Sequence, residues 1–340
     1  MPKYNGDITV GIVSFIKEGQ MVKRVVTAAT TYLITAACCS LLAGQPFAGY
    51  TTSAGRNPAF AGAVGDGTLR MFYSSIYPGS GYNLNRIHLS YDTYSELVRG
   101  GVGFSVDSDH PGGLMDDIRG RAIYAYHLQA SGDLFFFGGL SAGLIYRSFR
   151  QGSLVFPDQI DPVSGAVLPG GGVVPVKPLL LFDMGAGLLA EYRGLVVSVA
   201  ADHLPVPDIS GRGMPGGSLE RLFTLQAHYN HSGRDEITVL TPYAGISGDG
   251  SSILMSAGGA FRYDMVSVSL MVSGGDKITS ARVGLSLSGS RISCLYSFSF
   301  STSGAMNGIP FALMHQVGIR TGLNIVDKRY SVRTIFFPDL

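Results

Sequence analysis

Serine, histidine and aspartate are the residue types in this chain whose grouping could support chemistry. Asp107, Asp109, Asp116 and Asp117 cluster in one predicted outer loop. Their carboxylates could hold Ca²⁺ through oxygen ligands, or the loop could simply be acidic and solvated. We expect the solvated loop. The seven histidines lack the close H-x-x-x-H or cysteine-paired spacing of zinc sites. Serine is too abundant for the sequence to single out a nucleophile, so we expect no catalytic residue, no metal, no cofactor and no enzymatic activity.

One glycine motif has the form of a nucleotide-binding fingerprint. The stretch "GAGLLA" (185–190) fits G-x-G-x-x-G/A, but this fingerprint functions only within a βαβ unit. No such unit is visible around it, so we expect a glycine-rich strand here.

The composition indicates a protein with little charged surface. The 340 residues include 47 glycines, 18 phenylalanines, 17 tyrosines and no tryptophan, and only 14% are charged, against about 25% in a typical soluble domain. The net charge is +1, and no basic run is interleaved with aromatic residues, so nucleic acid is not expected as a partner. Beyond one N-terminal segment the apolar residues are dispersed, as in a membrane β-barrel.

That continuous apolar segment predicts a signal peptide. A basic pair ending at Arg24 precedes "VVTAATTYLITAACCSLLAG" (25–44), which is the order of regions in a secretory signal. Residues 1–44 are thus expected to be an N-terminal extension plus signal peptide, and residues 1–20 could be an overcalled start. The alternatives are an uncleaved anchor helix, because the segment exceeds the usual apolar region of about 7–15 residues, and a lipoprotein site at Cys38.

From residue 66 onward, segments in which apolar and polar residues alternate with a period of two follow one another. In "RISCLYSFSFSTSG" (291–304), Tyr296, Phe298 and Phe300 share one parity and serines take the other, which predicts a strand with one apolar and one hydroxyl-rich face. No sustained helical stripe is present. The predicted strands span about 67–77, 84–95, 99–107, 118–130, 132–149, 178–192, 194–204, 218–231, 235–247, 251–263, 265–274, 277–288, 290–303 and 312–325.

The lengths of the connections favour a membrane barrel over a soluble sandwich. Outer-membrane barrels have short periplasmic turns and longer outer loops. Short turns such as "YSEL", "SG" and "RG" alternate with connections of which 150–177 is the longest, although "GDG" and "GGD" are short where long loops are expected. We therefore predict an all-β fold, an antiparallel transmembrane β-barrel of outer-membrane type with about 14 strands over 67–325, followed by a periplasmic tail over 326–340.

Polar residues on the inward parity agree with this barrel. A charge that faces lipid at the midplane is destabilising by about 2–4 kcal/mol, so charged residues on strands belong in a watered lumen. The candidate lumen residues are Arg86, His88, Arg121, Gln226, His228, Arg282 and Arg320. Without tryptophan, the interface girdles must use residues such as Tyr73, Tyr77, Tyr124, Tyr126 and Phe300.

The segment 45–66 carries a motif. Within "QPFAGYTTSAGRNPAFAG" (45–62), the motif comprises Asn57, Pro58, Ala59, Phe60, Ala61 and Gly62. Pro58 fixes φ and Gly62 frees it, so we expect a sharp turn into the first strand. The stretch resembles the opening of the PorP/SprF family of the Bacteroidetes type IX secretion and gliding system, which commonly has Asn-Pro-Ala-Tyr-Ala-Gly after a Gln-rich start.

Two further stretches extend the resemblance along the chain. "FDMGAGLLAEYRGLVVSVAADHLPVPD" (182–208) looks like the central glycine-rich hairpin of the family, and "YSFSFSTSGAMNGIPFALMHQVGI" (296–319) looks like its closing strands. The chain departs from the family at "LRMFYSSIY", where an arginine-rich, tryptophan-containing strand is usual.

The resemblance implies an outer-membrane protein that works beside the type IX translocon. Its implied partners are outer-membrane lipid, secreted cargo with a C-terminal sorting domain, gliding adhesins among them, and periplasmic lipoprotein components of the machine. The implied function is to dock or guide specific cargo at the cell surface. Two other classes share a barrel: a porin or transporter for small or hydrophobic solutes, and an outer-membrane enzyme that would depend on one serine or histidine.

The first prediction concerns processing. Since the apolar run ends at "LLAGQ", we expect cleavage of the signal and a mature chain that starts close to Gln45. N-terminal sequencing of protein extracted from membranes measures this, and recovery of an intact 25–44 segment would contradict it.

Overall fold

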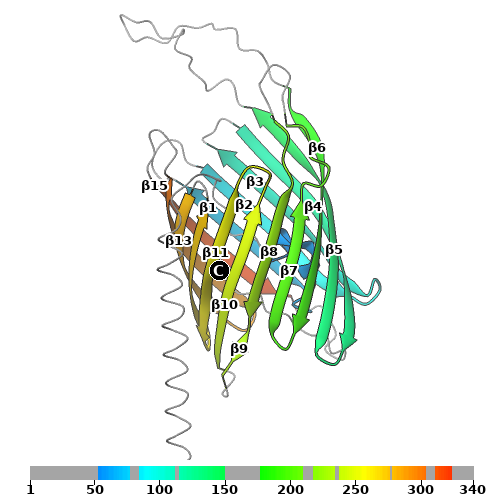
Figure 1. Ribbon diagram of the computed structural model, residues 1–340, viewed down its shortest axis with the longest axis vertical. Coiled ribbons are helices and arrows are strands. Elements are labelled where there is room, and N and C mark those ends of the chain that lie inside the picture. The colour runs from blue at the N-terminus through cyan, green and yellow to red at the C-terminus, as the bar shows by residue number, and fades with distance from the viewer. Residues whose placement is uncertain are drawn as a thin grey trace, which may run out of the picture.

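The computed structural model describes residues 53–76, 84–111, 115–149, 177–209, 217–233, 237–275, 278–303 and 311–323. In this range the chain forms an antiparallel β-barrel (Figure 1). The predicted signal peptide (1–44) and tail (326–340) lie outside the described residues, as does Tyr77 of the predicted girdles. Within the described residues, no helix is both long and apolar enough to cross a membrane.

Fourteen strands close the wall of the barrel in the described part of the chain. Consecutive strands pair antiparallel, and β15 pairs with β1 to complete the ring. β9 continues β8 beyond Asn230 and pairs with the same neighbour, β10, so fifteen segments make fourteen strands. The segments are β1 (Thr68–Ile76), β2 (Leu84–Ser95), β3 (Gly100–Pro111), β4 (Met115–Ser131), β5 (Leu134–Phe149), β6 (Leu179–Tyr192), β7 (Leu195–Asp202), β8 (Leu222–Tyr229), β9 (His231–Ser232), β10 (Thr238–Gly248), β11 (Ile253–Tyr263), β12 (Val266–Gly275), β13 (Ile278–Ser288), β14 (Ile292–Ser303) and β15 (Phe311–Gly322). The predicted barrel of about 14 strands is confirmed.

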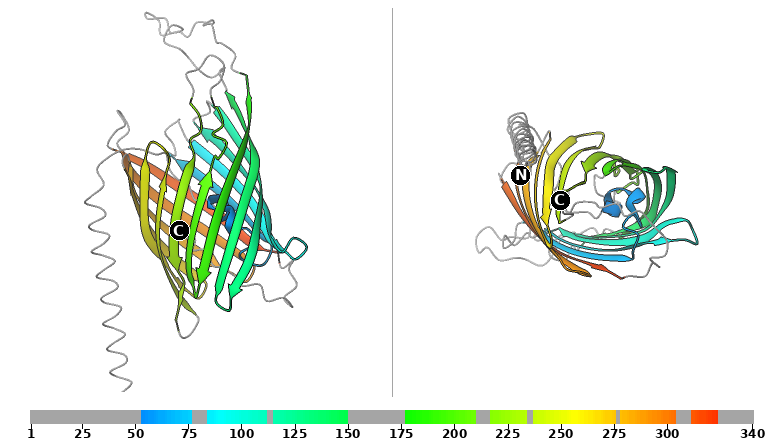
Figure 2. Two further views of the ribbon diagram at one scale, coloured as in Figure 1. Left: turned by 45° about the vertical axis from the view of Figure 1, so that its right-hand side comes forward. Right: turned by 90° about the horizontal axis from the view of Figure 1, so that it is seen from below.

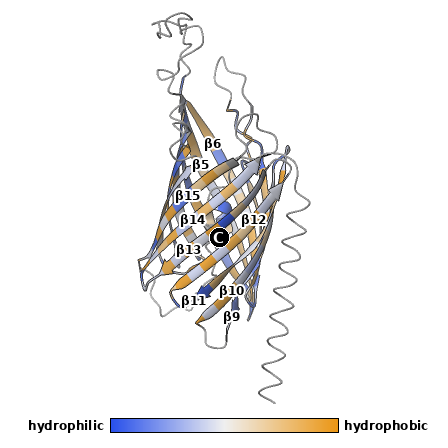
Figure 3. Ribbon diagram, turned by 90° about the vertical axis from the view of Figure 1, so that its left-hand side faces the viewer, coloured by the Kyte–Doolittle hydropathy of each residue, from blue (hydrophilic) through white to orange (hydrophobic). Residues whose placement is uncertain are grey.

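The period-two pattern fixes which side chains face outward. On β14, Tyr296 and Phe300 are 42% and 41% exposed, whereas Ser297 and Ser299 are only 4% and 2% exposed. Figure 3 shows the alternation as apolar and polar positions that succeed one another along β10 to β15. The hydroxyl-rich face therefore lines the inside of the barrel, and the aromatic face meets the lipid, as the sequence predicts.

The two longest connections lie at the same end of the barrel. At one end, β4 and β5 are joined by 132–133, β6 and β7 by 193–194, and β11 and β12 by 264–265. At the other end, the connections between β5 and β6 and between β7 and β8 run over 150–178 and 203–221. Because outer-membrane barrels place their short turns in the periplasm, the long connections belong to the extracellular end.

The wall is taller over one sector. β4, β5 and β6 have 17, 16 and 14 residues, whereas a tilted strand needs about 9–11 residues to cross the hydrocarbon layer. Figure 1 shows β5 and β6 rising past the other strands at one end. Part of this sector therefore stands outside the membrane.

The prediction of an acidic loop over 107–117 is wrong. β3 extends to Pro111 and β4 begins at Met115, so only 112–114 separate the two strands. Both strands continue through residues that the sequence predicted to form a loop, because Asp109 pairs with Asp117 and extends the ladder between β3 and β4. Among the described residues, no group of three or more His, Cys, Asp or Glu side chains is arranged to hold a metal ion.

The segment before β1 lies inside the barrel. It contains a short helix, α2 (Ser53–Arg56), and a 3₁₀ turn, η1 (Pro58–Phe60), and Figure 2 shows these elements, in blue, within the ring of strands. Gly62 and Gly65 take φ values of +67° and +82°, which glycine allows. The expected sharp turn into the first strand is confirmed, but the segment does more than turn, since it also fills part of the lumen.

The second prediction tests the assignment of the two faces. Leu270 points outward at the middle of β12 and is 46% exposed, whereas Ser256 points inward on β11 and is half-buried. Leu270→Arg should destabilise the barrel by about 2–4 kcal/mol, while Ser256→Arg should be tolerated because its charge reaches the lumen. Urea unfolding followed by heat-modifiable gel mobility measures the difference, and equal stability of the two variants would contradict the assignment.

Candidate functional site in the barrel lumen

The motif at 57–62 is buried throughout. Asn57, Ala59 and Phe60 are 1%, 0% and 2% exposed. Asn57 caps η1, because its Oδ1 accepts a hydrogen bond of 2.9 Å from the backbone N–H of Ala59. Pro58 occupies the first position of the turn, where a missing N–H leaves no hydrogen bond unmade. The sequence Asn-Pro-Ala is therefore sufficient to start this turn locally.

The amide of Asn57 ties the turn to the barrel wall. Its Nδ2 donates to the backbone carbonyls of Leu188 on β6 and Val199 on β7, at 3.2 and 3.1 Å. These two wall residues are registered opposite each other. One buried side chain thus joins η1 to two strands. Its removal would leave these two buried carbonyls without hydrogen bonds, and each unsatisfied group would destabilise the protein by about 1–3 kcal/mol.

Inward glycines on three strands make room for the motif. A Cβ atom on Gly101 of β3 would lie 1.8 Å from the carbonyl oxygen of Ala61, and one on Gly187 of β6 would lie 1.9 Å from Oδ1 of Asn57. On β5, a Cβ atom on Gly139 would lie 2.2 Å from a backbone nitrogen of the motif. No side chain fits at these distances, so Gly101, Gly139 and Gly187 form a glycine wall against which the motif rests.

The end of the motif is anchored by charged and aromatic residues. The N–H of Gly62 donates to Oδ2 of Asp92 at 2.9 Å, and the other oxygen of Asp92 forms an ion pair with Arg70. Nε2 of His127 lies 3.0 Å from the carbonyl oxygen of Ala61, so this nitrogen must carry the proton. β1, β2 and β4 therefore hold the segment from the side opposite to the Asn57 contacts.

An apolar cluster completes the seat of the N-terminal segment. Its members come from the N-terminal segment 54–63 and from the inward faces of β4, β5, β6 and β7. They are Ala54, Ala59, Phe60, Ala61, Ala63, Ile123, Ala125, Phe137, Leu189 and Val196. Burial of these side chains stabilises the segment in place, since each buried CH₂ contributes about 0.8 kcal/mol.

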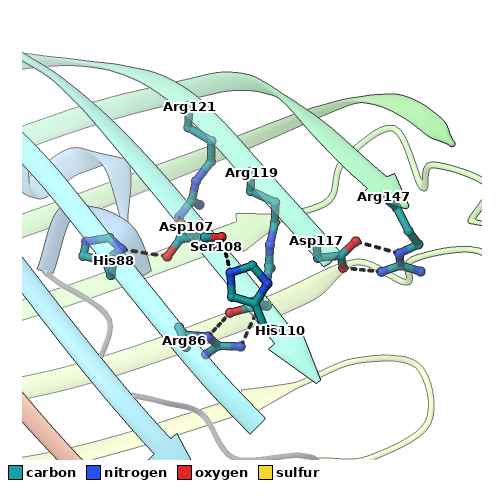
Figure 4. A network of polar contacts seen from close by, with 10 residues as sticks. Arg86, His88, Asp107, Ser108, His110, Asp117, Arg119, Arg121 and Arg147 are labelled. Carbon is teal, nitrogen blue, oxygen red and sulfur yellow. Dashed lines mark hydrogen bonds and ion pairs between the residues drawn. The ribbon is translucent and has the colours of Figure 1, made fainter. Parts of the chain in front are cut away.

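A second inner surface, here called the charged wall, lies toward the extracellular end of β2 to β7. Figure 4 shows part of this surface, from Arg86 on β2 to Arg147 on β5, with its hydrogen bonds and ion pairs. The ion pairs are Arg86–Asp109, Arg119–Asp109, His88–Asp107, Arg121–Asp107, Arg121–Asp202, Arg147–Asp117 and His203–Asp183. The four arginines pair with four of the five carboxylates, and the fifth, Asp183, pairs with His203, so the surface carries little net charge.

Arg121 spans the charged wall by crossing two glycines. Its guanidinium lies 3.6 Å from Asp107 on β3 and 3.8 Å from Asp202 on β7. A Cβ atom on Gly143 of β5 would lie 2.8 Å from Cγ of Arg121, and one on Gly185 of β6 would lie 2.7 Å from Oδ1 of Asp202. The side chain can reach past two intervening strands because neither strand carries a side chain there.

The predicted lumen residues all lie on the inward face, but they do not form one site. Arg86, His88 and Arg121 join the charged wall. Gln226 and His228 lie buried on β8, on another part of the ring. Arg282 and Arg320 lie on β13 and β15, among inward serines; Arg320 donates to Oγ of Ser293 at 3.4 Å.

Sequence analysis missed the residues that hold the motif. Asp92 and His127 have the inward parity but no feature that links them to residue 60. The three inward glycines, Gly101, Gly139 and Gly187, share one signal, which is glycine on an inward position of a strand. That signal indicates close approach of another backbone, yet it does not say which one.

Comparison with known proteins identifies the family of the chain. The family model of the type IX secretion system membrane protein PorP/SprF matches residues 50–316. The chain belongs to the PorP/SprF family. The matched range contains the motif, the glycine wall and the charged wall. As a PorP/SprF membrane protein with an outer-membrane type of barrel, the chain is located in the outer membrane and works with components of the secretion system.

Several solved barrels are similar to this PorP/SprF chain. The toluene transporter TodX of Pseudomonas putida has 12% identity and a TM-score of 0.47, covering 84% of this chain and 96% of its own. A FadL homologue of Pseudomonas aeruginosa has 9% identity and a TM-score of 0.49, covering 82% and 96%. The outer membrane protein Omp33 of Acinetobacter baumannii has 7% identity and a TM-score of 0.43, covering 77% and 100%. No curated protein matches the sequence significantly.

The third prediction tests the glycine wall. Gly139→Ala should displace the motif, because the new Cβ atom would meet backbone 2.2 Å away. The barrel should remain heat-modifiable, but trypsin should cleave after Arg56 at least ten times faster than in the wild type. The matched control is Gly138→Ala on the same strand, whose Cβ atom would meet only the Leu188 side chain, at 3.7 Å. Equal protection of the two variants would show that the motif does not depend on this contact.

Proposed function

We propose that this PorP/SprF barrel docks or guides specific type IX cargo at the cell surface. Its cargo consists of proteins with a C-terminal sorting domain, which include gliding adhesins. In this proposal the protein comes from a member of the Bacteroidetes and its signal peptide is cleaved. The mature barrel would also contact periplasmic lipoprotein components of the type IX secretion system. This role requires no catalytic residue and no cofactor.

The observation that carries the proposal is the seating of the family motif inside the lumen. Hydrogen bonds from Asn57, close contacts with the glycine wall and the apolar cluster hold 57–62 against β3 to β7. A segment held by so many backbone contacts is a structural part of the barrel. A wall covered in this way favours a scaffold over an open channel for solutes.

The charged wall supports the same proposal. A selective pore uses rings of one sign of charge to attract its solute. Here each carboxylate of the charged wall is paired with an arginine or a histidine. Arg147, for example, donates two hydrogen bonds to Asp117, at 2.8 and 2.6 Å. Groups that satisfy each other hold neighbouring strands together and offer no surplus charge to a solute.

The extracellular end provides the docking platform in this proposal. β4, β5 and β6 exceed the length needed to cross the membrane, so their ends stand above it. The connection after β7 continues this projection, because Asp208 and Ser218 form a β-bridge and Leu219 donates to the carbonyl of Pro207 at 2.9 Å. Long outer connections on a rigid wall are common binding elements.

The fourth prediction is a gene deletion. Loss of the gene should remove one large sorting-domain protein from the cell surface while bulk type IX secretion continues, because the proposed role concerns specific cargo. Quantitative proteomics of the cell surface and of the culture medium measures this. An unchanged surface proteome together with reduced uptake of a small solute would contradict docking and favour the transporter.

Complementation locates the docking surface. Replacing 151–176 with a short Gly-Ser linker should fail to restore the cargo, even though the barrel assembles. The same linker inserted into the short turn at 249–252 should restore it, and this variant controls for altered loop length. Full restoration by the first variant would show that the cargo binds elsewhere.

A further inference from the structure

A Ser-His-Asp arrangement lies on the outer face of the barrel, away from the lumen. Ser108 and His110 share the outward parity of β3 with Phe104 and Val106, which are 45% and 38% exposed. Oγ of Ser108 lies 3.0 Å from Nε2 of His110, a contact drawn in Figure 4. Nδ1 of His110 lies 2.6 Å from Oδ1 of Asp116 on β4.

The three side chains are connected in the order that nucleophilic catalysis needs. The carboxylate of Asp116 holds the proton on Nδ1 of His110, so Nε2 is left as the acceptor for the hydroxyl proton of Ser108. The histidine side chain is 35% exposed and the Asp116 side chain 15%. The base is therefore accessible from outside, while the carboxylate that orients it is shielded.

We propose that Ser108, His110 and Asp116 form a serine-hydrolase site that cleaves acyl esters of lipids in the outer leaflet. Ser108 is registered with Ile87 on β2 and Ile118 on β4, which are 39% and 41% exposed on the outer face. These apolar side chains lie beside the triad on the lipid-facing wall. An acyl chain can lie along them while its ester reaches Ser108 at the rim.

The reaction follows from these positions. Oγ of Ser108 attacks the ester carbonyl carbon, and its proton moves to Nε2 of His110. The tetrahedral adduct collapses, the bond from carbon to the alcohol oxygen breaks, and the alcohol leaves with the proton from Nε2. Water then attacks the acyl-serine and gives a proton to Nε2. The second tetrahedral adduct collapses, the bond from carbon to Oγ of Ser108 breaks, and Oγ takes the proton back from Nε2 as the fatty acid leaves.

Asn85 is the donor for the oxyanion in this scheme. It is registered opposite His110 on β2, and its Oδ1 accepts a hydrogen bond of 3.1 Å from the hydroxyl of Tyr73. That bond directs the carboxamide oxygen toward Tyr73, so the amide nitrogen is the group that Asn85 offers to a ligand. Loss of one oxyanion donor typically lowers kcat by about 10²–10³-fold.

The fifth prediction uses full-length protein folded in detergent micelles. A fluorophosphonate probe should label Ser108, because Oγ displaces fluoride from phosphorus, and mass spectrometry locates the label. The protein should also hydrolyse p-nitrophenyl hexanoate and release fatty acid from phosphatidylethanolamine vesicles. Both activities should fall to background in Ser108→Ala. Ser75→Ala, an outward serine on β1, is the matched control and should keep both.

Asp116 is a positioning residue, and its test separates orientation from folding. Asp116→Asn should lower kcat on the order of 10³–10⁴-fold with little change in KM, while gel mobility stays heat-modifiable. Asn85→Ala should lower kcat by the smaller factor given above. The proposal is overturned if folded wild-type protein neither labels at Ser108 nor hydrolyses either substrate, or if Ser108→Ala retains the activity. Hydrolysis of the nitrophenyl ester without release of fatty acid from vesicles would overturn the lipid assignment.

Discussion

Every backbone N–H and C=O group within the hydrocarbon layer needs a partner in the protein, because lipid offers none. The ring of fourteen strands meets this requirement by pairing β15 with β1. Pro242 on β10 shows how closely the requirement is followed. Toward β8 and β9 the ladder omits Thr241 and Pro242, and the hydroxyl of Thr241 instead donates to Oδ1 of Asn230 at 3.0 Å. A side chain thus bridges the place where proline has no N–H to give.

Closure of the ring places polar side chains and backbone groups inside the barrel, and these groups find their partners in two ways. Toward the extracellular end, charged side chains satisfy each other, as Arg121 does with Asp107 and Asp202. Toward the other end, the N-terminal segment brings its own backbone into the lumen and finds partners such as Asp92 and His127. Both arrangements need inward glycines on the strands. A side chain at these glycines would push Arg121 away from Asp202, or the N-terminal segment away from the wall.

The hairpin of β3 and β4 shows that one register sets two different chemistries. Asp109 is paired with Asp117 on the inward face, where arginines neutralise both. One residue further along each strand, His110 meets Asp116 on the outward face with Ser108 beside it. The inner set supports the wall, and the outer set lies on the outer face of the barrel. A shift of the register by one residue would exchange the two faces, so the charged wall and the proposed hydrolase site depend on the same ladder.

The sequence by itself determined the barrel, its two faces and most of its short turns. A period of two is a local property, so β14 and the inward position of Ser299 could be predicted from neighbouring residues alone. Turn composition likewise predicted the short connections. The end of β3 was mispredicted, because pairing with β4 extends a strand through residues that look like a loop.

Only the tertiary structure decided which distant residues meet. The seat of Asn57 against Gly139 and Gly187 joins three parts of the chain, and no local pattern encodes contacts between strands. The same holds for Ser108, which cannot be singled out among many serines until the register places Asp116 behind His110. The parity of a residue along its strand determines whether its side chain points inward or outward. The strand register and the closure of the ring determine which side chains it contacts, and both depend on the free energy of the whole ring.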